Sequence, residues 1–192
     1  SWLFSEPQVK KQIREIKRVD DRAEDKFGNS TKAILDQYGE ALMVVASKAI
    51  KNNLRKKKPM RINLSTFPEE LRCNAACFVT LNKDGKLRGC IGSIQAWRPL
   101  VTDVAENACK AAFQDARFPE LTSQELKESK ISLHISVLSP QVPLSFATEE
   151  DLVFQLRPGL DGIVLVEGKR RGVFLPVVWE SLPEPKKFLG QL

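Results

Sequence analysis

The sequence predicts an α+β fold in which antiparallel sheets, built from hairpins, pack against helices. Two β-rich runs flank turn residues 82–85, and a second pair of β-rich runs flanks residues 168–172. Between residues 34 and 50, apolar side chains recur at helical spacing. The sequence shows no strand–helix alternation with a glycine-rich phosphate loop. Gly89 and Gly92 are too close together for a dinucleotide-binding or P-loop motif.

The composition fits one domain, or two small lobes that share a core. The chain has 192 residues, of which 42% are hydrophobic and 28% are charged. Its apolar runs are shorter than the roughly 18 residues that a membrane span needs, and the N-terminal stretch lacks the features of a signal peptide. Four cysteines in a chain of this length do not predict a disulfide scaffold. We therefore expect a cytoplasmic protein with reduced thiols and no membrane segment.

The first elements are a charged segment and a long amphipathic helix. Residues 1–28 are charged on nearly every side, and they predict a linker, a peripheral helix or the remnant of an upstream domain. Gly28 and Asn29 indicate a break there. Ser30 or Thr31 can then cap a helix that runs to about Leu54.

A basic block lies at the end of this helix. Residues 41–68 contain no Asp or Glu, yet they contain seven Lys and Arg residues, all between positions 48 and 61. Such a run can bind nucleic acid or anionic lipid, or it can be the solvated end of a helix whose C-terminal dipole favours cations. No aromatic residues are interleaved for base stacking, so the second reading is preferred. We predict only weak nucleic-acid binding through residues 48–61.

The first hairpin carries a thiol between two glycines. Its strands are the runs ACFVTL and KLRGCI, joined by Asn82-Lys83-Asp84-Gly85. The period of two along a strand places Arg88 and Cys90 on one face of the return strand and the residues next to them on the other. Glycine weakens a strand, so Gly89 and Gly92 indicate a bulge or a close approach by backbone or ligand.

The remaining elements alternate between helices and strands. Pro99 suits the first turn of a helix that has a narrow face of small residues and ends near Pro119. The run 130–138 alternates as a strand, with residues 131, 133, 135 and 137 facing inward. Thr148 and Asp151 indicate a short helix to Leu156. A second hairpin over residues 162–176 and the start of a helix in EPKKFLGQL complete the chain.

Three separated stretches of the sequence resemble the AMMECR family, whose bacterial and archaeal members are called AmmeMemoRadiSam system protein A. These stretches are GKLRGCIGSIQAWRPLVTDVAENACKAAFQDARFPELT, ISVLSP and GIVLVEGKRRGVFLPVVW. They occur in the family's order, and the hallmark LRGCIG is intact at positions 87–92. The resemblance covers roughly residues 31–192.

The resemblance implies an α+β fold with a larger and a smaller lobe over residues 29–192. It also implies a functional association with a Memo-type protein and a radical S-adenosylmethionine enzyme, but it brings no established reaction. The sequence departs from the family pattern in two places. Ala116 stands where the family's DPRF motif has proline, and a KAGL-like segment past the final helix is missing. We therefore expect the C-terminal end of the domain to be truncated.

Cys90 is the candidate nucleophile. A nearby arginine or a cluster of backbone amides favours the thiolate form of a cysteine. Arg88 is the first candidate for that role, and Arg117 is the second if the fold brings it near. Five further residues are candidates for binding a substrate or partner: Gly89, Gly92, Asp115, Arg117 and Phe118. The glycine amides would face a developing oxyanion, and Asp115 would orient Arg117 or act as a base. The opposing interpretation is that Cys90 is a small core residue.

No general base is evident in the sequence. His134 is the only histidine, and a lone strand histidine is more often a surface residue. Cys73 and Cys77 have the wrong spacing for a zinc knuckle, so neither a metal nor a cofactor is predicted. Two functions stay open: a thiol-bearing accessory enzyme domain that handles a small substrate, and a non-catalytic module that binds a protein or RNA.

Overall fold

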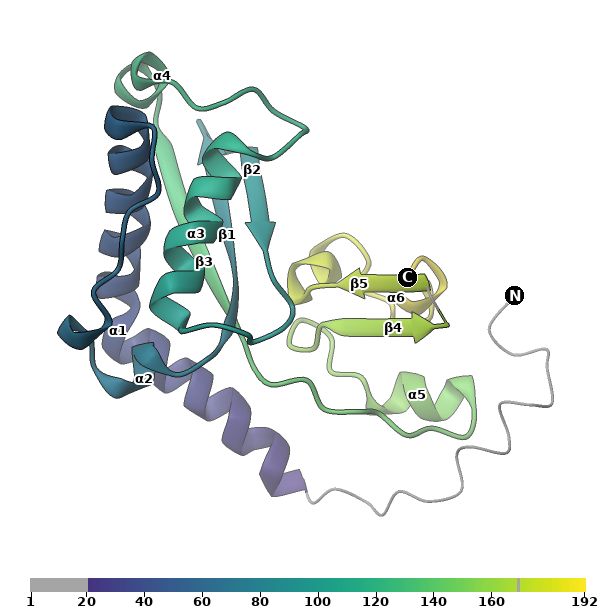
Figure 1. Ribbon diagram of the computed structural model, residues 1–192. Coiled ribbons are helices and arrows are strands. Elements are labelled where there is room, and N and C mark those ends of the chain that lie inside the picture. The colour runs from purple at the N-terminus through teal and green to yellow at the C-terminus, as the bar shows by residue number, and fades with distance from the viewer. Residues whose placement is uncertain (1–20, 169) are drawn as a thin grey trace. The chain divides into compact units, whose positions relative to one another are not determined.

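The computed structural model describes residues 21–168 and 170–192. Within them the chain forms an α+β fold with six α-helices, a three-stranded antiparallel sheet and a two-stranded hairpin (Figure 1). The described residues form two compact units: a larger one that ends at Gln141, and a smaller one over Val142–Leu192. The predicted fold class is thus confirmed. The predictions for residues 1–20 lie outside the described residues.

Helix α1, Asp21–Lys56, is longer than the sequence predicts. It begins before Gly28, so the predicted break at Gly28-Asn29 and the cap at Ser30 or Thr31 are wrong. A glycine inside a helix costs only about 1 kcal/mol relative to alanine, and propagating a helix is easier than starting one. The helical spacing of apolar residues predicted over residues 34–50 is confirmed, since α1 buries Leu42, Val45, Ala46, Ala49 and Ile50.

The sheet of the larger unit has the strand order β2-β1-β3. Its strands are β1 (Ala76–Lys83), β2 (Lys86–Gly92) and β3 (Ile131–Leu138). The predicted turn between β1 and β2 is confirmed: Asp84 and Gly85 both have positive φ, as a type I′ turn requires. β1 is the central strand and pairs antiparallel with both neighbours.

Helix α3, Leu100–Phe113, packs with α1 on one face of this sheet (Figure 1). Its small residues meet the inward side chains of β1, Cys77, Val79 and Leu81, in one buried cluster. The helix ends earlier than the predicted stop at Pro119, so residues 114–119 are free to run along the edge of the sheet. Three short elements of the larger unit were not predicted: η2 (Leu64–Thr66), α2 (Glu69–Arg72) and α4 (Ser123–Glu128).

The smaller unit has its own core. It consists of α5 (Glu149–Gln155), the hairpin of β4 (Ile163–Glu167) and β5 (Arg170–Phe174), η3 (Pro176–Glu180) and α6 (Pro185–Gly190). Trp179 stacks on Phe188 with ring centroids 3.7 Å apart. The predicted cap of α5 is confirmed, because the Thr148 hydroxyl accepts a hydrogen bond from the Asp151 backbone N–H. The predicted second hairpin is also confirmed, but its turn is shorter than the predicted residues 168–172, because β5 already begins at Arg170.

No helix in the described part of the chain combines the length and the apolar character that crossing a bilayer requires.

Candidate functional site

Arg88 does not lie beside Cys90 as the strand period predicted. The register of β1 and β2 shifts between Leu81 and Asn82, so that Arg88 is the extra residue of a β-bulge. Its side chain is buried and forms a bidentate ion pair with Glu125 of α4, at 2.7 and 3.0 Å. It also donates to the Pro119 carbonyl. The prediction of a shared face fails because the bulge interrupts the alternation on which it was based.

Cys90 is partly exposed and hydrogen-bonded through its sulfur. The Thr80 Oγ1 lies 3.2 Å from the Cys90 Sγ, and the two residues are direct partners across β1 and β2. They belong to the face opposite Val79 and Leu81, which enter the core. A hydroxyl donor at this distance stabilises a thiolate more than a thiol, because the hydrogen bond to the charged form is the stronger one.

The third strand adds an imidazole to this arrangement. Thr80 is also the direct partner of His134 on β3, and the His134 side chain is exposed. Adjacent antiparallel partners stand about 4.5–5.5 Å apart at Cα. A thiol, a hydroxyl and an imidazole therefore form one row across the three strands. The sequence already showed that His134 lies on the outward face of β3, but only strand pairing sets its register with Cys90.

Asp115 and Arg117 hold the backbone of Cys90 at the outer edge of β2. The Asp115 Oδ2 accepts from the Cys90 backbone N–H at 2.9 Å, and the Arg117 Nη2 donates to the Cys90 carbonyl at 3.4 Å. The two side chains also form an ion pair at 2.8 Å. The sequence made both residues candidates for the same site as Cys90, and the structure places them beside it.

Electrostatics assigns different roles to this pair. Hydrogen bonds from Arg117 hold the pKa of the Asp115 carboxyl well below its usual range, against the effect of burial. A carboxylate so strongly tied is a poor proton acceptor. The pKa of Arg117 is raised, first by its hydrogen bonds with Asp115. Arg117, rather than Arg88, is therefore the arginine that contacts Cys90.

The glycines of the LRGCIG run are required by packing. A Cβ on Gly89 would lie 2.1 Å from the Ala111 carbonyl oxygen of α3. A Cβ on Gly92 would lie 2.3 Å from the Phe78 ring and 2.5 Å from the Cys77 carbonyl oxygen. Such distances exclude a side chain at either position. The close approach anticipated from the sequence is made by the protein's own backbone and an aromatic ring.

Phe118 lies between two cationic groups. The guanidinium carbon of Arg88 is 5.8 Å from the Phe118 ring centroid, and that of Arg117 is 5.5 Å away. Both distances lie within the range of a cation–π interaction. Phe118 thus links the buried ion pair of Arg88 to the clamp on Cys90.

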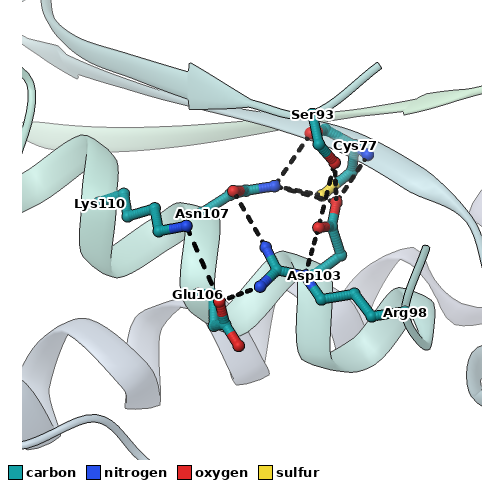
Figure 2. A network of polar contacts seen from close by, with 7 residues as sticks. All are labelled: Cys77, Ser93, Arg98, Asp103, Glu106, Asn107 and Lys110. Carbon is teal, nitrogen blue, oxygen red and sulfur yellow. Dashed lines mark hydrogen bonds and ion pairs between the residues drawn. The ribbon is translucent and has the colours of Figure 1, made fainter. Parts of the chain in front are cut away.

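A second polar cluster lies on the opposite face of the sheet (Figure 2). Asp103 is fully buried and accepts hydrogen bonds from the Arg98 Nε at 2.6 Å, the Cys77 backbone N–H at 2.9 Å and the Asn107 Nδ2 at 2.9 Å. Asn107 also donates to the Cys77 carbonyl, and Arg98 pairs with Glu106. The sequence analysis missed these residues. Asp103 and Asn107, four residues apart on the buried side of a predicted helix, were the available signal.

Burial disfavours the charged form of the Cys77 thiol. Burial, and then the charge of Asp103, raise the pKa of the Cys77 thiol far above its usual range. In the described part of the chain, no group of three or more His, Cys, Asp or Glu side chains is placed to hold a metal ion. Cys90, in contrast to Cys77, is partly exposed and accepts a hydrogen bond from the Thr80 hydroxyl.

Comparison with known proteins gives consistent matches. A sequence model of the AMMECR1 family matches residues 43–192. A protein from Methanothermobacter thermautotrophicus is 38% identical over 140 residues, which cover 73% of this chain and 71% of the relative. A protein from Thermotoga maritima is 40% identical over 133 residues, which cover 68% and 72%. The crystal structure of an uncharacterized protein from Pyrococcus horikoshii superimposes with a TM-score of 0.73 at 30% identity, covering 81% of this chain and 77% of that one.

Proposed function

The chain belongs to the AMMECR1 family, and we propose that it is a thiol-bearing enzyme domain that transfers a group from a small substrate through Cys90. The observation that carries the proposal is the hydrogen bond between the Thr80 hydroxyl and the Cys90 sulfur, in a row that ends at His134. A nucleophilic thiol needs a proton acceptor within reach. In this row the acceptor is His134, acting through the Thr80 hydroxyl.

The proposed acylation of Cys90 needs proton transfers and one substitution at a carbonyl carbon. The Thr80 hydroxyl turns its proton from the Cys90 sulfur to the His134 imidazole and takes the Cys90 proton in its place, so that it again donates to the sulfur, which is now a thiolate. The sulfur then forms a bond to a carbonyl carbon of the substrate, and the bond to the leaving group breaks. The leaving group departs with the proton from the imidazolium, so that an acyl group remains on Cys90 for transfer to an acceptor.

The clamp on the Cys90 backbone supports the same proposal. Asp115 and Arg117 hold the N–H and the carbonyl of the reacting residue, so the sulfur is held on a fixed strand. Positioning of this kind lowers a barrier because the orientation is set before the reaction. The exposed guanidinium of Arg117 adds positive charge where negative charge would develop.

The partners implied by the family resemblance belong to this proposal. A Memo-type protein and a radical S-adenosylmethionine enzyme would supply the acyl donor or take the group from Cys90. The alternative, in which the chain binds a partner without catalysis, rests on a different region of the molecule, the groove beside β3.

Peptide-resolved labelling with iodoacetamide tests the proposal on the folded protein. Cys73 is the matched control, because it is exposed and lies outside the row. We expect Cys90 to label faster than Cys73 despite its lower exposure, because only the thiolate reacts. Thr80→Val keeps the shape of the side chain and removes the hydroxyl, so it should abolish most of the advantage. Equal rates for the two cysteines would contradict a nucleophilic role.

A second measurement tests the acyl transfer itself. With p-nitrophenyl acetate we expect nitrophenolate release together with a single acetyl group on the peptide that contains Cys90. Cys90→Ser should abolish the adduct, and His134→Gln should reduce its rate of formation by roughly 10²-fold or more. An acetyl group found only on lysines would show that the thiol performs no such chemistry.

A further inference from the structure

A groove in the larger unit is lined by residues of α1 and β3. Its volume is about 560 Å³, and Figure 1 shows α1 alongside β3. Its apolar lining comes from three elements and includes Met43, Ile50, Leu126, Ile131 and Leu133. The consecutive residues Ile131, Ser132 and Leu133 all line it. Because successive strand side chains point to opposite faces, three in a row indicate that the groove follows the edge of the strand.

The hydrogen-bond pattern of the sheet shows which backbone groups face that edge. The Ser93 N–H donates to the Cys77 carbonyl, so the odd-numbered residues of β1 bond towards β2 and the even-numbered ones bond towards β3. Thr80 therefore exchanges hydrogen bonds with His134, its partner on β3. By the same alternation, Ile131 and Leu133 direct their N–H and C=O groups outward. In the described part of the chain, β3 pairs with β1 alone.

The rim of the groove is basic. On a helix, Lys48, Lys51 and Arg55 form one stripe at spacings of three and four residues, next to the stripe of Met43, Ser47 and Ile50. All three cations are exposed, and Lys51 itself lines the groove. None of them has an ion-pair partner among the residues that the structure describes. An apolar floor beside unpaired cations is complementary to a chain that carries both apolar and acidic side chains.

We propose that the outer edge of β3 binds an extended, acidic and apolar segment of a partner protein, which adds to the sheet as a fourth strand. Its backbone pairs with Ile131 and Leu133, its apolar side chains fill the groove, and its carboxylates bind the cations of α1. Recognition by strand addition takes affinity from main-chain hydrogen bonds and specificity from pockets for side chains. Charge complementarity selects acidic segments and speeds their association. A nucleic acid fits less well, because the groove offers apolar side chains instead of stacking rings.

Hydrogen exchange followed by NMR tests this on the whole chain. The probe is an acetylated and amidated peptide of about nine residues, the length of a long strand, built from leucine-valine-glutamate repeats. We expect the peptide to slow exchange of the Ile131 and Leu133 amides by at least about tenfold. The amides of Ser132 and His134, which already bond to β1, are the internal controls and should not change.

Matched peptides and variants separate the contributions. A peptide with lysine in place of glutamate should not bind, nor should one with proline in place of valine, because proline lacks the N–H that pairing needs. Lys51→Glu should weaken binding about tenfold, roughly the 1.4 kcal/mol of one close charge pair. Arg72→Glu, an exposed charge change on α2, should leave binding unchanged.

Three results would overturn the proposal. Equal binding of the acidic and basic peptides, or exchange slowed at other amides, would show that the edge does not select this ligand. Displacement of the peptide by a thymidine oligonucleotide would assign the basic rim to nucleic acid. Protection of Ile131 and Leu133 that grows with protein concentration, without peptide, would assign the edge to a second copy of the chain.

Discussion

The two faces of the three-stranded sheet each carry a cysteine in a polar cluster, and they differ in how much water reaches them. Cys77 faces α3, is fully buried and is held by Asp103 and Asn107. Cys90 faces the other way, is partly exposed and is held through its backbone by Asp115 and Arg117. Both clusters contain an Asp–Arg ion pair, yet the same chemical groups have different consequences.

Desolvation explains the difference. On the inner face, burial penalises a charged sulfur, and the fixed carboxylate of Asp103 adds to that penalty. The inner cluster therefore ties α3 to β1 and leaves its thiol inert. On the outer face, the Thr80 hydroxyl donates to the Cys90 sulfur, and the Arg117 guanidinium donates to the Cys90 carbonyl. The buried cluster around Cys77 therefore contributes to stability, whereas the partly exposed cluster around Cys90 is the one on which the proposed reaction depends.

Removing the centre of the inner cluster should have the largest effect. Asp103→Ala leaves the Arg98 guanidinium and the Cys77 N–H buried without their main partner. We therefore expect the free energy of unfolding to decrease by about 3–5 kcal/mol. Urea denaturation measures this. Glu106→Gln, at a half-exposed position that pairs with the same arginine, should cost less than about 1 kcal/mol. An equal loss of stability in the two variants would show that the buried cluster does not tie α3 to β1.

A methyl group on the inner side of β2 should also be costly. Gly89→Ala drives a Cβ into the Ala111 carbonyl oxygen, and we expect a loss of about 3 kcal/mol because backbone on both sides must move. Gly39→Ala is the matched control, because it lies in α1 with no atom near its Cβ position. That variant should gain up to about 1 kcal/mol from better helix propensity. A Gly89→Ala protein as stable as the Gly39→Ala protein would refute the close approach.

The two arginines near Phe118 should separate stability from reactivity. Arg88→Met breaks a buried bidentate ion pair with Glu125, so we expect a loss of about 2 kcal/mol and an unchanged rate of Cys90 alkylation in the folded protein. Arg117→Met should show the opposite pattern, with slower alkylation and little loss of stability, because its side chain is 57% exposed. If Arg88→Met slowed alkylation as much as Arg117→Met did, the outer face would depend on both charges.

The smallest effect concerns pH. The pKa of Asp115 is lowered in the folded state, so its ionised form contributes stability that is complete above the ordinary aspartate pKa near 3.9 and is lost as the pH falls. The stability difference between the wild type and Arg117→Met should therefore be below about 1 kcal/mol at neutral pH and smaller still near pH 3. Urea denaturation at both pH values measures it. A difference that grew in acid would have the wrong sign for this ion pair.

Local patterns allowed much of the fold to be predicted. The alternation in β1 and β3, the turn at Asp84-Gly85 and the cap at Thr148 each depend on a few neighbouring residues, and the structure confirms them. The start of α1 was predicted wrongly, because a Gly-Asn pair looks like a stop even where helix propagation tolerates it. The short helices α2 and α4 were missed, because four to six residues hold too little periodicity to be seen.

The candidate site divides in the same way. The sequence placed Cys90 on a hairpin strand beside Gly89 and Gly92, which indicated a close approach, and it made Asp115 and Arg117 candidates for the same site. Tertiary contacts set the rest: a bulge directs Arg88 to Glu125, Thr80 stands between Cys90 and His134, and Asp103 lies in the core. Strand register, bulges and buried ion pairs are set by contacts between residues far apart in the chain, so no local pattern could specify them.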